Sequence, residues 1–150
     1  MAVRLCWCLV ATLCLWSASV SSETQAGGKS EVDLGKKANK ARIQDLLDFA
    51  VKEYNKISND LYFYKQCNTI SAQTQVVSGV KYYIIANIVR TQCAKNRSSG
   101  YGDGASCDVA CSDGAQVYVC QFEVWVRVWL EGSEKEILLS SSCNPSNENP

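Results

Sequence analysis

Apolar residues first recur at a helical spacing, along a segment whose other positions are largely charged. The stripe consists of Ile43, Leu46, Leu47, Ala50 and Tyr54, while Arg42, Asp45, Lys52 and Lys56 lie off it. A recurrence at i, i+3, i+4, i+7 and i+11 is typical of an amphipathic helix with one buried face. The pattern therefore predicts a helix from about residue 39 to about residue 55.

The hydrophobic pattern of the second half is that of strands. Residues 61–77 and 80–91 are rich in Tyr, Val and Ile, and they flank Ser78-Gly79, a dipeptide typical of a hairpin turn. Residues 136–142 are long enough for a return strand. We therefore expect a long hairpin followed by further antiparallel strands.

Residues 116–130 alternate most clearly. One face carries Tyr118, Cys120, Phe122, Val124, Val126 and Val128, and the other carries Gln121, Glu123 and Arg127. Such alternation indicates a strand with one buried face. One long helix followed by four or five antiparallel strands predicts an α+β domain, in which the helix covers the apolar face of the sheet.

The N-terminal residues follow neither pattern. Residues 1–22 begin with one cation, Arg4, continue through an apolar run and end in small residues, which is typical of a secretory signal peptide. The run is too short for a membrane span, which takes about 20 apolar residues. Residues 23–38 show no sustained periodicity, and we expect a flexible arm there. The domain is then expected over 39–143 with a C-terminal tail at 144–150, in a secreted, soluble protein.

Composition excludes several functional classes. The chain has 150 residues, of which 47% are hydrophobic and 20% charged, so it can bury a core. It contains no histidine, which excludes Ser–His and Cys–His catalysis and every zinc site that needs an imidazole. Its 15 cationic and 15 anionic residues balance, so nothing favours nucleic acid as a partner. We expect no enzymatic activity, no metal and no cofactor.

Six cysteines remain once the signal peptide is removed: Cys67, Cys93, Cys107, Cys111, Cys120 and Cys143. An even number in an oxidising compartment indicates disulfides. Cys107 and Cys111 lie in a long glycine- and serine-rich loop, residues 94–115, which a bridge would pin. The same loop contains an N-glycosylation sequon at Asn96, which a secreted protein can use.

Three stretches carry a family resemblance: LDFAVKEYNK at 47–56, QVVSGVKYY at 75–83 and FEVWVRVWL at 122–130. In this order, between about Gly27 and Cys143, they resemble the secreted type 2 cystatins, inhibitors of papain-like cysteine proteases. The ordered combination is far more specific than any five-residue motif. The resemblance implies the cystatin fold, a five-stranded antiparallel sheet wrapped around one long helix.

The resemblance also implies which residues bind the protease. In that family an N-terminal glycine, a Gln-x-Val-x-Gly hairpin and a Pro-Trp hairpin form one wedge that enters the protease cleft. The central motif is complete here as Gln75, Val76, Val77, Ser78 and Gly79. Val128 stands where the family has proline, before a retained Trp129. Trp129 lies opposite the apolar face of its segment, which favours a contact role over a place in the core.

The N-terminal arm matches the family least well. Gly27-Gly28 resembles the family's glycine pair but lacks large apolar neighbours. The alternatives are that Gly35 serves instead after a register shift, with Leu34 as its apolar neighbour, or that the arm is only solvated.

These features favour a secreted, reversible, competitive inhibitor of papain-like cysteine proteases such as cathepsins. The departures at Val128 and in the arm support an alternative, a cystatin-fold extracellular interaction or defence protein with weak or no papain-family inhibition. We expect a monomer, with a dimer swapped through the Gln75 to Gly79 hairpin as the other state. The sequence does not identify the target protease.

By family order, Cys120 pairs with Cys143, and Cys93 pairs with Cys107 or Cys111. Counting back from the hairpin turn places Cys67 opposite about residues 87–89, near the start of the long loop. A third bridge, from Cys67 to the other loop cysteine, is therefore within reach.

Ser58-Asn59-Asp60 follows the predicted helix. It resembles the Ser-Asn-Asp loop with which some secreted cystatins inhibit asparaginyl endopeptidase, an enzyme that requires Asn in its specificity pocket. The alternative is a plain turn, because Asn and Asp hydrogen-bond their own backbone. We expect Asn59 to form a second inhibitory site, away from the hairpins that carry Gln75 to Gly79 and Trp129.

Overall fold

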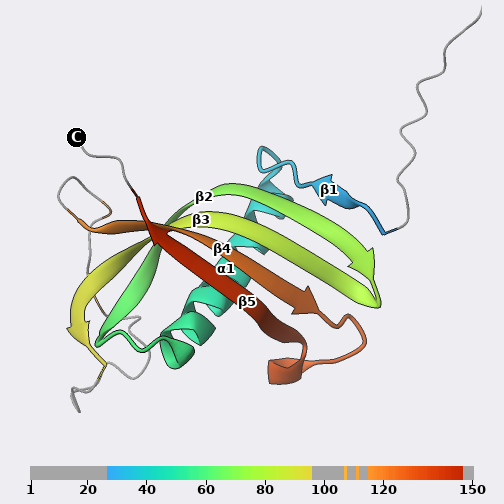
Figure 1. Cartoon of the computed structure of the whole chain (residues 1–150). Helices are drawn as coiled ribbons and strands as arrows, with labels where there is room; N and C mark the ends of the chain where they lie inside the picture. The colour runs from blue at the N-terminus through green and yellow to red at the C-terminus, as the bar shows by residue number, and fades with distance from the viewer. Residues whose placement is uncertain (1–26, 96–106, 108–110, 112–114, 147–150) are drawn as a thin grey trace, which may run out of the picture.

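The computed structural model describes residues 27–95, 107, 111 and 115–146. Its elements are β1 (Lys29–Glu31), α1 (Lys37–Ile57), β2 (Tyr62–Val77), β3 (Gly79–Ala94), β4 (Val117–Val126), the 3-10 helix η1 (Gly132–Glu134) and β5 (Glu136–Pro145). The five strands form one antiparallel sheet in chain order, and the sheet curves around α1 (Figure 1). This is the α+β fold expected from the sequence. The predicted signal peptide and the sequon at Asn96 lie outside the described residues, and no described helix is long and apolar enough to cross a membrane.

The helix packs on the sheet through the stripe that its sequence predicts. Ile43, Leu46, Leu47 and Ala50 are at most 1% exposed, and Val51 joins them at 5%. The opposing sheet face contributes Ile84, Ala86, Ile88, Cys120, Phe122, Val124 and Val126 to the same core. Burying a side chain of this size contributes about 1.5–3 kcal/mol, so the interface between helix and sheet is the main source of stability.

Part of the segment predicted as a flexible arm is instead an edge strand. Lys29–Glu31 pairs with residues 73–75 of β2, and the backbone N–H of Val32 donates to the carbonyl of Ala72. Val32 and Leu34 then pack against the core. Three exposed strand residues give no alternation to detect, so only the pairing partner on β2 reveals this strand.

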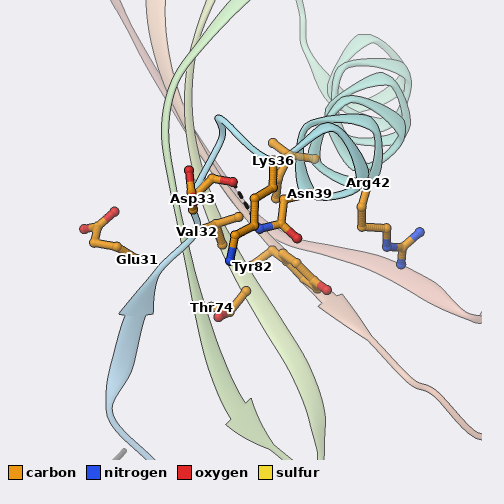
Figure 2. Close-up of a pocket in the computed structure, with 9 residues that line it drawn as sticks. Glu31, Val32, Asp33, Lys36, Asn39, Arg42, Thr74 and Tyr82 are labelled. Carbon is orange, nitrogen blue, oxygen red and sulfur yellow. Dashed lines mark hydrogen bonds between the residues drawn. The ribbon is translucent and has the colours of Figure 1, made fainter. Parts of the chain in front are cut away.

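The chain between β1 and α1 is held by local hydrogen bonds, around an open pocket at the start of the helix (Figure 2). The Asn39 amide donates to the carbonyl of Asp33 at 3.0 Å, and the Asp33 carboxylate accepts from the backbone N–H of Gly35 at 2.9 Å. These hydrogen bonds therefore fix the direction in which the chain passes from β1 into α1.

Two disulfides fasten the sheet to the β3–β4 connection, and a third joins the paired strands β4 and β5. They join Cys67 to Cys111, Cys93 to Cys107 and Cys120 to Cys143. Cys67 falls between positions that pair with Ile88 and Asn87, as counting from the turn predicts. The structure thus decides which loop cysteine pairs with Cys93, a choice that the sequence leaves open.

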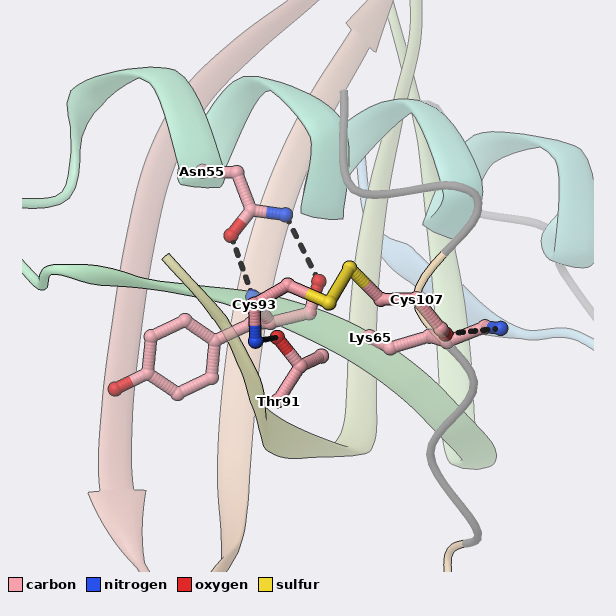
Figure 3. The surroundings of a disulfide bond; sticks show 6 residues. Asn55, Lys65, Thr91, Cys93 and Cys107 are labelled. Atoms are coloured by element: carbon pink, nitrogen blue, oxygen red, sulfur yellow. Dashed lines mark hydrogen bonds between the residues drawn. A yellow bond between two sulfur atoms is a disulfide. The ribbon is translucent and has the colours of Figure 1, made fainter. Parts of the chain in front are cut away.

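A buried asparagine connects the helix to an irregular part of the sheet (Figure 3). Asn55 is 6% exposed, and its amide donates to the Tyr64 carbonyl and accepts from the Tyr64 N–H, both at 2.8 Å. The pairing of β2 with β3 shifts register between Tyr62 and Tyr64. The side chain of Asn55 therefore satisfies backbone groups on β2 next to this register shift.

We predict that Asn55→Ala lowers the free energy of unfolding by about 2–4 kcal/mol, because it leaves a buried donor and a buried acceptor without partners. Urea unfolding measures the change. Asn68→Ala removes an exposed side-chain hydrogen bond to Asn87 and serves as the control, with an expected change within about 0.5 kcal/mol. Equal effects of the two substitutions would contradict the role of Asn55.

Candidate functional site

Three parts of the chain meet at one end of the sheet (Figure 1). They are residues 27–28 before β1, the β2–β3 turn at residues 77–79, and the connection from β4 at residues 127–131. Lys29 pairs with Gln75, and Val80 pairs with Val126, so the sheet register places the three segments next to one another. We call this end of the molecule the hairpin edge.

The hairpin edge exposes apolar side chains. Val76 is 69% exposed, Val128 64%, Trp129 54% and Val77 38%. Leaving such side chains in water gives up the stabilisation that burial would bring, and apolar side chains gathered on a surface are a common feature of binding sites. The hairpin residues and Trp129 thus lie together, as the sequence resemblance implies.

Val128 does not continue the buried face of β4, contrary to the alternation in the sequence. The strand ends at Val126, and the chain then turns, with the N–H of Arg127 donating to the carbonyl of Lys135 at 2.8 Å. The N–H of Leu130 donates back to the carbonyl of Arg127 at 3.1 Å. These backbone bonds close a loop, and Val128 lies in that loop and not in the sheet. Its spacing in the sequence would otherwise place it on the apolar face of β4.

Gly79 is where the two hairpins touch. Its φ of +91° belongs to the left-handed region that favours glycine. A Cβ there would lie 2.4 Å from the carbonyl oxygen of Val126 and 3.0 Å from Nε1 of Trp125. Any side chain at this position would therefore push the β2–β3 turn away from the neighbouring loop.

Gln75 connects the arm to the sheet. Its Nε2 donates to the carbonyl of Gly27 at 2.6 Å, and its Oε1 accepts from the Tyr83 hydroxyl at 2.7 Å. The ammonium of Lys29 lies 3.6 Å from the centre of the Tyr83 ring, within cation–π range. Polar contacts thus hold the arm. The expectation from the sequence rested on large apolar neighbours of Gly27-Gly28 and could not reveal these contacts.

The register-shift alternative for the arm does not fit the structure. Leu34 packs against the core, so its side chain is not free to act as an apolar anchor. Gly35 lies at the start of the helix, beside Asp33, and not at the hairpin edge. Of the two glycine positions considered, only Gly27-Gly28 lies with the hairpins.

Asn59 lies at the opposite end of β2, in the connection from α1. It is exposed, while Ser58 and Asp60 on either side are half-buried. The Lys95 ammonium donates to the Ser58 carbonyl at 2.9 Å and to its hydroxyl at 3.1 Å. The two ends of β2 are roughly 50 Å apart along the strand, so the connection and the hairpin edge are separate surfaces.

Asp60 anchors this connection. Its carboxylate accepts from the N–H of Tyr62 at 3.0 Å and from the hydroxyl of Tyr64 at 2.8 Å, and Arg90 lies 3.8 Å away. Burial by itself would raise the pKa of Asp60, but these hydrogen bonds and the nearby cations Arg90 and Lys95 hold it below its ordinary value. Burial and the bond to Asp60 raise the pKa of Tyr64. The carboxylate is therefore kept ionised next to Asn59.

A helix held in a curved five-stranded antiparallel sheet, with apolar loops at one end, is the architecture of the cystatins. A cystatin domain model matches residues 31–129. A cystatin of Pseudechis porphyriacus is 39% identical over 104 residues, covering 68% of this chain and 72% of that protein. One from Pseudonaja textilis is 38% identical over the same length and shares of the two chains.

Solved structures have the same fold. Dimeric human cystatin F matches with a TM-score of 0.61 at 24% identity, covering 89% of this chain and 99% of that chain. Al-CPI matches with a TM-score of 0.61 at 28% identity, covering 80% and 100%. The chain belongs to the cystatin family, whose members inhibit cysteine proteases, and its three disulfides fit an extracellular location.

Because folding lowers the pKa of Asp60, its ionised form stabilises the fold above about pH 4, and this contribution is lost as the pH falls through the lowered pKa. We predict that Asp60→Asn lowers the free energy of unfolding at pH 7 by about 1.5–3 kcal/mol, the range for hydrogen bonds to charged groups. Urea unfolding should show this gap narrowing towards pH 2.5. Asp45→Asn, at an exposed helix position, should change stability by less than about 0.5 kcal/mol at pH 7. A gap for Asp60→Asn that is constant with pH would contradict the prediction.

Proposed function

We propose that this protein is a secreted, reversible, competitive inhibitor of papain-like cysteine proteases. The observation that supports it is the hairpin edge, where Val76, Val128 and Trp129 are more than half exposed at one end of a sheet that packs on the helix. An exposed apolar edge can fill a protease cleft, and its affinity is higher when less conformational entropy is lost on binding. The target is a papain-like enzyme such as a cathepsin.

The proposed mechanism is occlusion. The Gln75 to Gly79 turn, the Trp129 loop and the arm at Gly27-Gly28 together fill the cleft on both sides of the catalytic cysteine. The backbone of the turn belongs to the β2–β3 ladder, with Val77 paired to Gly79 across it. A turn held in this way is not presented as an extended substrate, so the enzyme is blocked and the inhibitor stays intact.

Trp129 is the residue we expect to contribute most to binding, because a large rigid indole in an exposed loop is typical of an interface hot spot. We predict that Trp129→Ala weakens papain inhibition by about 2 kcal/mol or more, roughly 30-fold in the inhibition constant, without unfolding the domain. Titration of papain with a fluorogenic substrate measures this, and circular dichroism checks the fold.

Ile70→Ala is the matched control, since Ile70 is 49% exposed on β2 but lies eight positions before the Ser78 turn. It should leave inhibition within twofold. A Trp129→Ala variant that also stays within twofold would exclude the proposed edge. A folded wild-type protein that fails to inhibit papain at micromolar concentration would favour the alternative, a cystatin-fold interaction or defence protein, which the missing proline at Val128 supports.

We further propose a second inhibitory surface for asparaginyl endopeptidase at Asn59. The supporting observation is that Asn59 projects between two anchored neighbours, Ser58 held by Lys95 and Asp60 held by Tyr64. Ile57 at 65% and Leu61 at 68% extend the exposed surface on both sides. An exposed Asn in a constrained loop offers the enzyme its preferred residue in a geometry that opposes release.

We predict that Asn59→Lys abolishes inhibition of asparaginyl endopeptidase and leaves papain inhibition within twofold, because the two surfaces lie at opposite ends of β2. Parallel assays of one preparation against both enzymes measure this, with papain inhibition as the internal control. Asn59→Gln keeps the amide on a longer side chain and should also lose inhibition. A wild-type protein that does not inhibit the endopeptidase at micromolar concentration would end the proposal.

A further inference from the structure

Trp125 on β4 reaches across the sheet to the β2–β3 turn. It pairs with Lys81 in the β3–β4 ladder and is not part of the core cluster on the helix side. Its indole Nε1 donates to the carbonyl of Ser78 at 2.7 Å, across a separation of 47 residues. One side chain on the outer face of the sheet thus bonds the tip of the first hairpin.

The same indole also contacts the second hairpin. The rings of Trp125 and Trp129 lie 6.2 Å apart at 70°, an edge-to-face pair within the favourable range for aromatic rings. The guanidinium carbon of Arg127 lies 5.6 Å from the Trp125 ring. Trp125 is therefore in contact with both loops of the hairpin edge.

Gly79 makes this arrangement sterically possible. A Cβ there would lie 3.0 Å from Nε1 of Trp125 and 3.4 Å from Cζ3 of Trp129. Without a side chain at this position, both indoles approach the turn. The two hairpins and the two tryptophans consequently pack as one unit around a glycine.

The loop after β4 carries Val128 at the position where the family resemblance implies proline. Valine leaves φ free where proline would restrict it, so more conformational entropy is lost when the loop binds. The edge-to-face contact with Trp125 orders Trp129 before any partner arrives. The hydrogen bond to Ser78 orders the first hairpin by means of the same residue.

We infer that Trp125 is a positioning residue, which fixes the Ser78 turn and Trp129 relative to each other and so replaces the preorganisation that proline would provide. This inference rests on the proposed inhibition of papain-like proteases. Trp125 acts through its two partners, and its contact with the protease is not required.

The decisive test is a double-mutant cycle of Trp125→Ala with Val128→Pro, read as the papain inhibition constant. Trp125→Ala should weaken inhibition about tenfold or more. Val128→Pro should recover the part of that loss that comes from the second hairpin, yet improve the wild-type protein by less than about threefold, because Trp125 already orders that loop. Equal gains from Val128→Pro in both backgrounds, or unchanged inhibition by Trp125→Ala, would overturn the inference.

Hydrogen–deuterium exchange of the free protein provides a second readout that needs no protease. Trp125→Ala should speed exchange about tenfold or more in both hairpins, at residues 78–80 and 127–130. Trp125→Phe keeps a ring against Trp129 but lacks the donor, so it should loosen mainly the first hairpin. Val119→Ala, on the same outer face of β4 but remote from the hairpins, should change neither. Exchange that rises in only one hairpin, or in neither, in Trp125→Ala would overturn the inference.

The two proposals fail in different ways. A wild-type protein that does not inhibit papain, but in which Trp125→Ala loosens both hairpins, would exclude the proposed function and keep the coupling by Trp125. A wild-type protein that inhibits papain, with exchange unaffected by Trp125→Ala, would exclude the coupling alone.

Discussion

Burial of the apolar stripe of α1 against the concave face of the sheet is the contact on which the rest of the structure depends. Leu46 and Leu47 on the helix and Phe122 on β4 are fully buried. A single helix can cover only one face of a sheet, so the strands must curve around it and their ends extend past it. The hairpin edge and the Asn59 connection are these ends. The buried interface between helix and sheet supplies most of the stability of the domain that holds them.

Among the described residues no helix covers the outer face of the sheet, and polar and aromatic side chains contact the hairpin edge there. Lys81 pairs with Glu123 at 2.8 Å, Gln75 links Tyr83 to the arm, and Trp125 reaches Ser78. Individual surface contacts of this kind contribute little to global stability. In the proposed inhibitor they restrain the exposed apolar loops, which lowers the conformational entropy lost when the loops bind a protease.

Local sequence patterns determine the elements that bury a face. The helical stripe from Ile43 to Tyr54 and the alternation along 116–126 are visible because burial imposes a period on neighbouring residues. The Ser78-Gly79 dipeptide placed the hairpin turn, and counting back from it placed Cys67 opposite about residues 87–89, where the register has Asn87 and Ile88. The family resemblance identified the edge residues as a set, and the fold brings the hairpin residues, Trp129 and Gly27 to one end of the sheet.

The tertiary structure decided what depends on partners distant in sequence. Lys29–Glu31 is a strand only because β2 offers an edge, and Val128 leaves the sheet only because backbone bonds between Arg127 and Lys135 close a loop. The role of Trp125 depends on a carbonyl 47 residues away. A short-range pattern records which face a residue buries, whereas contacts across a sheet depend on register, and register is set by the packing of the whole domain.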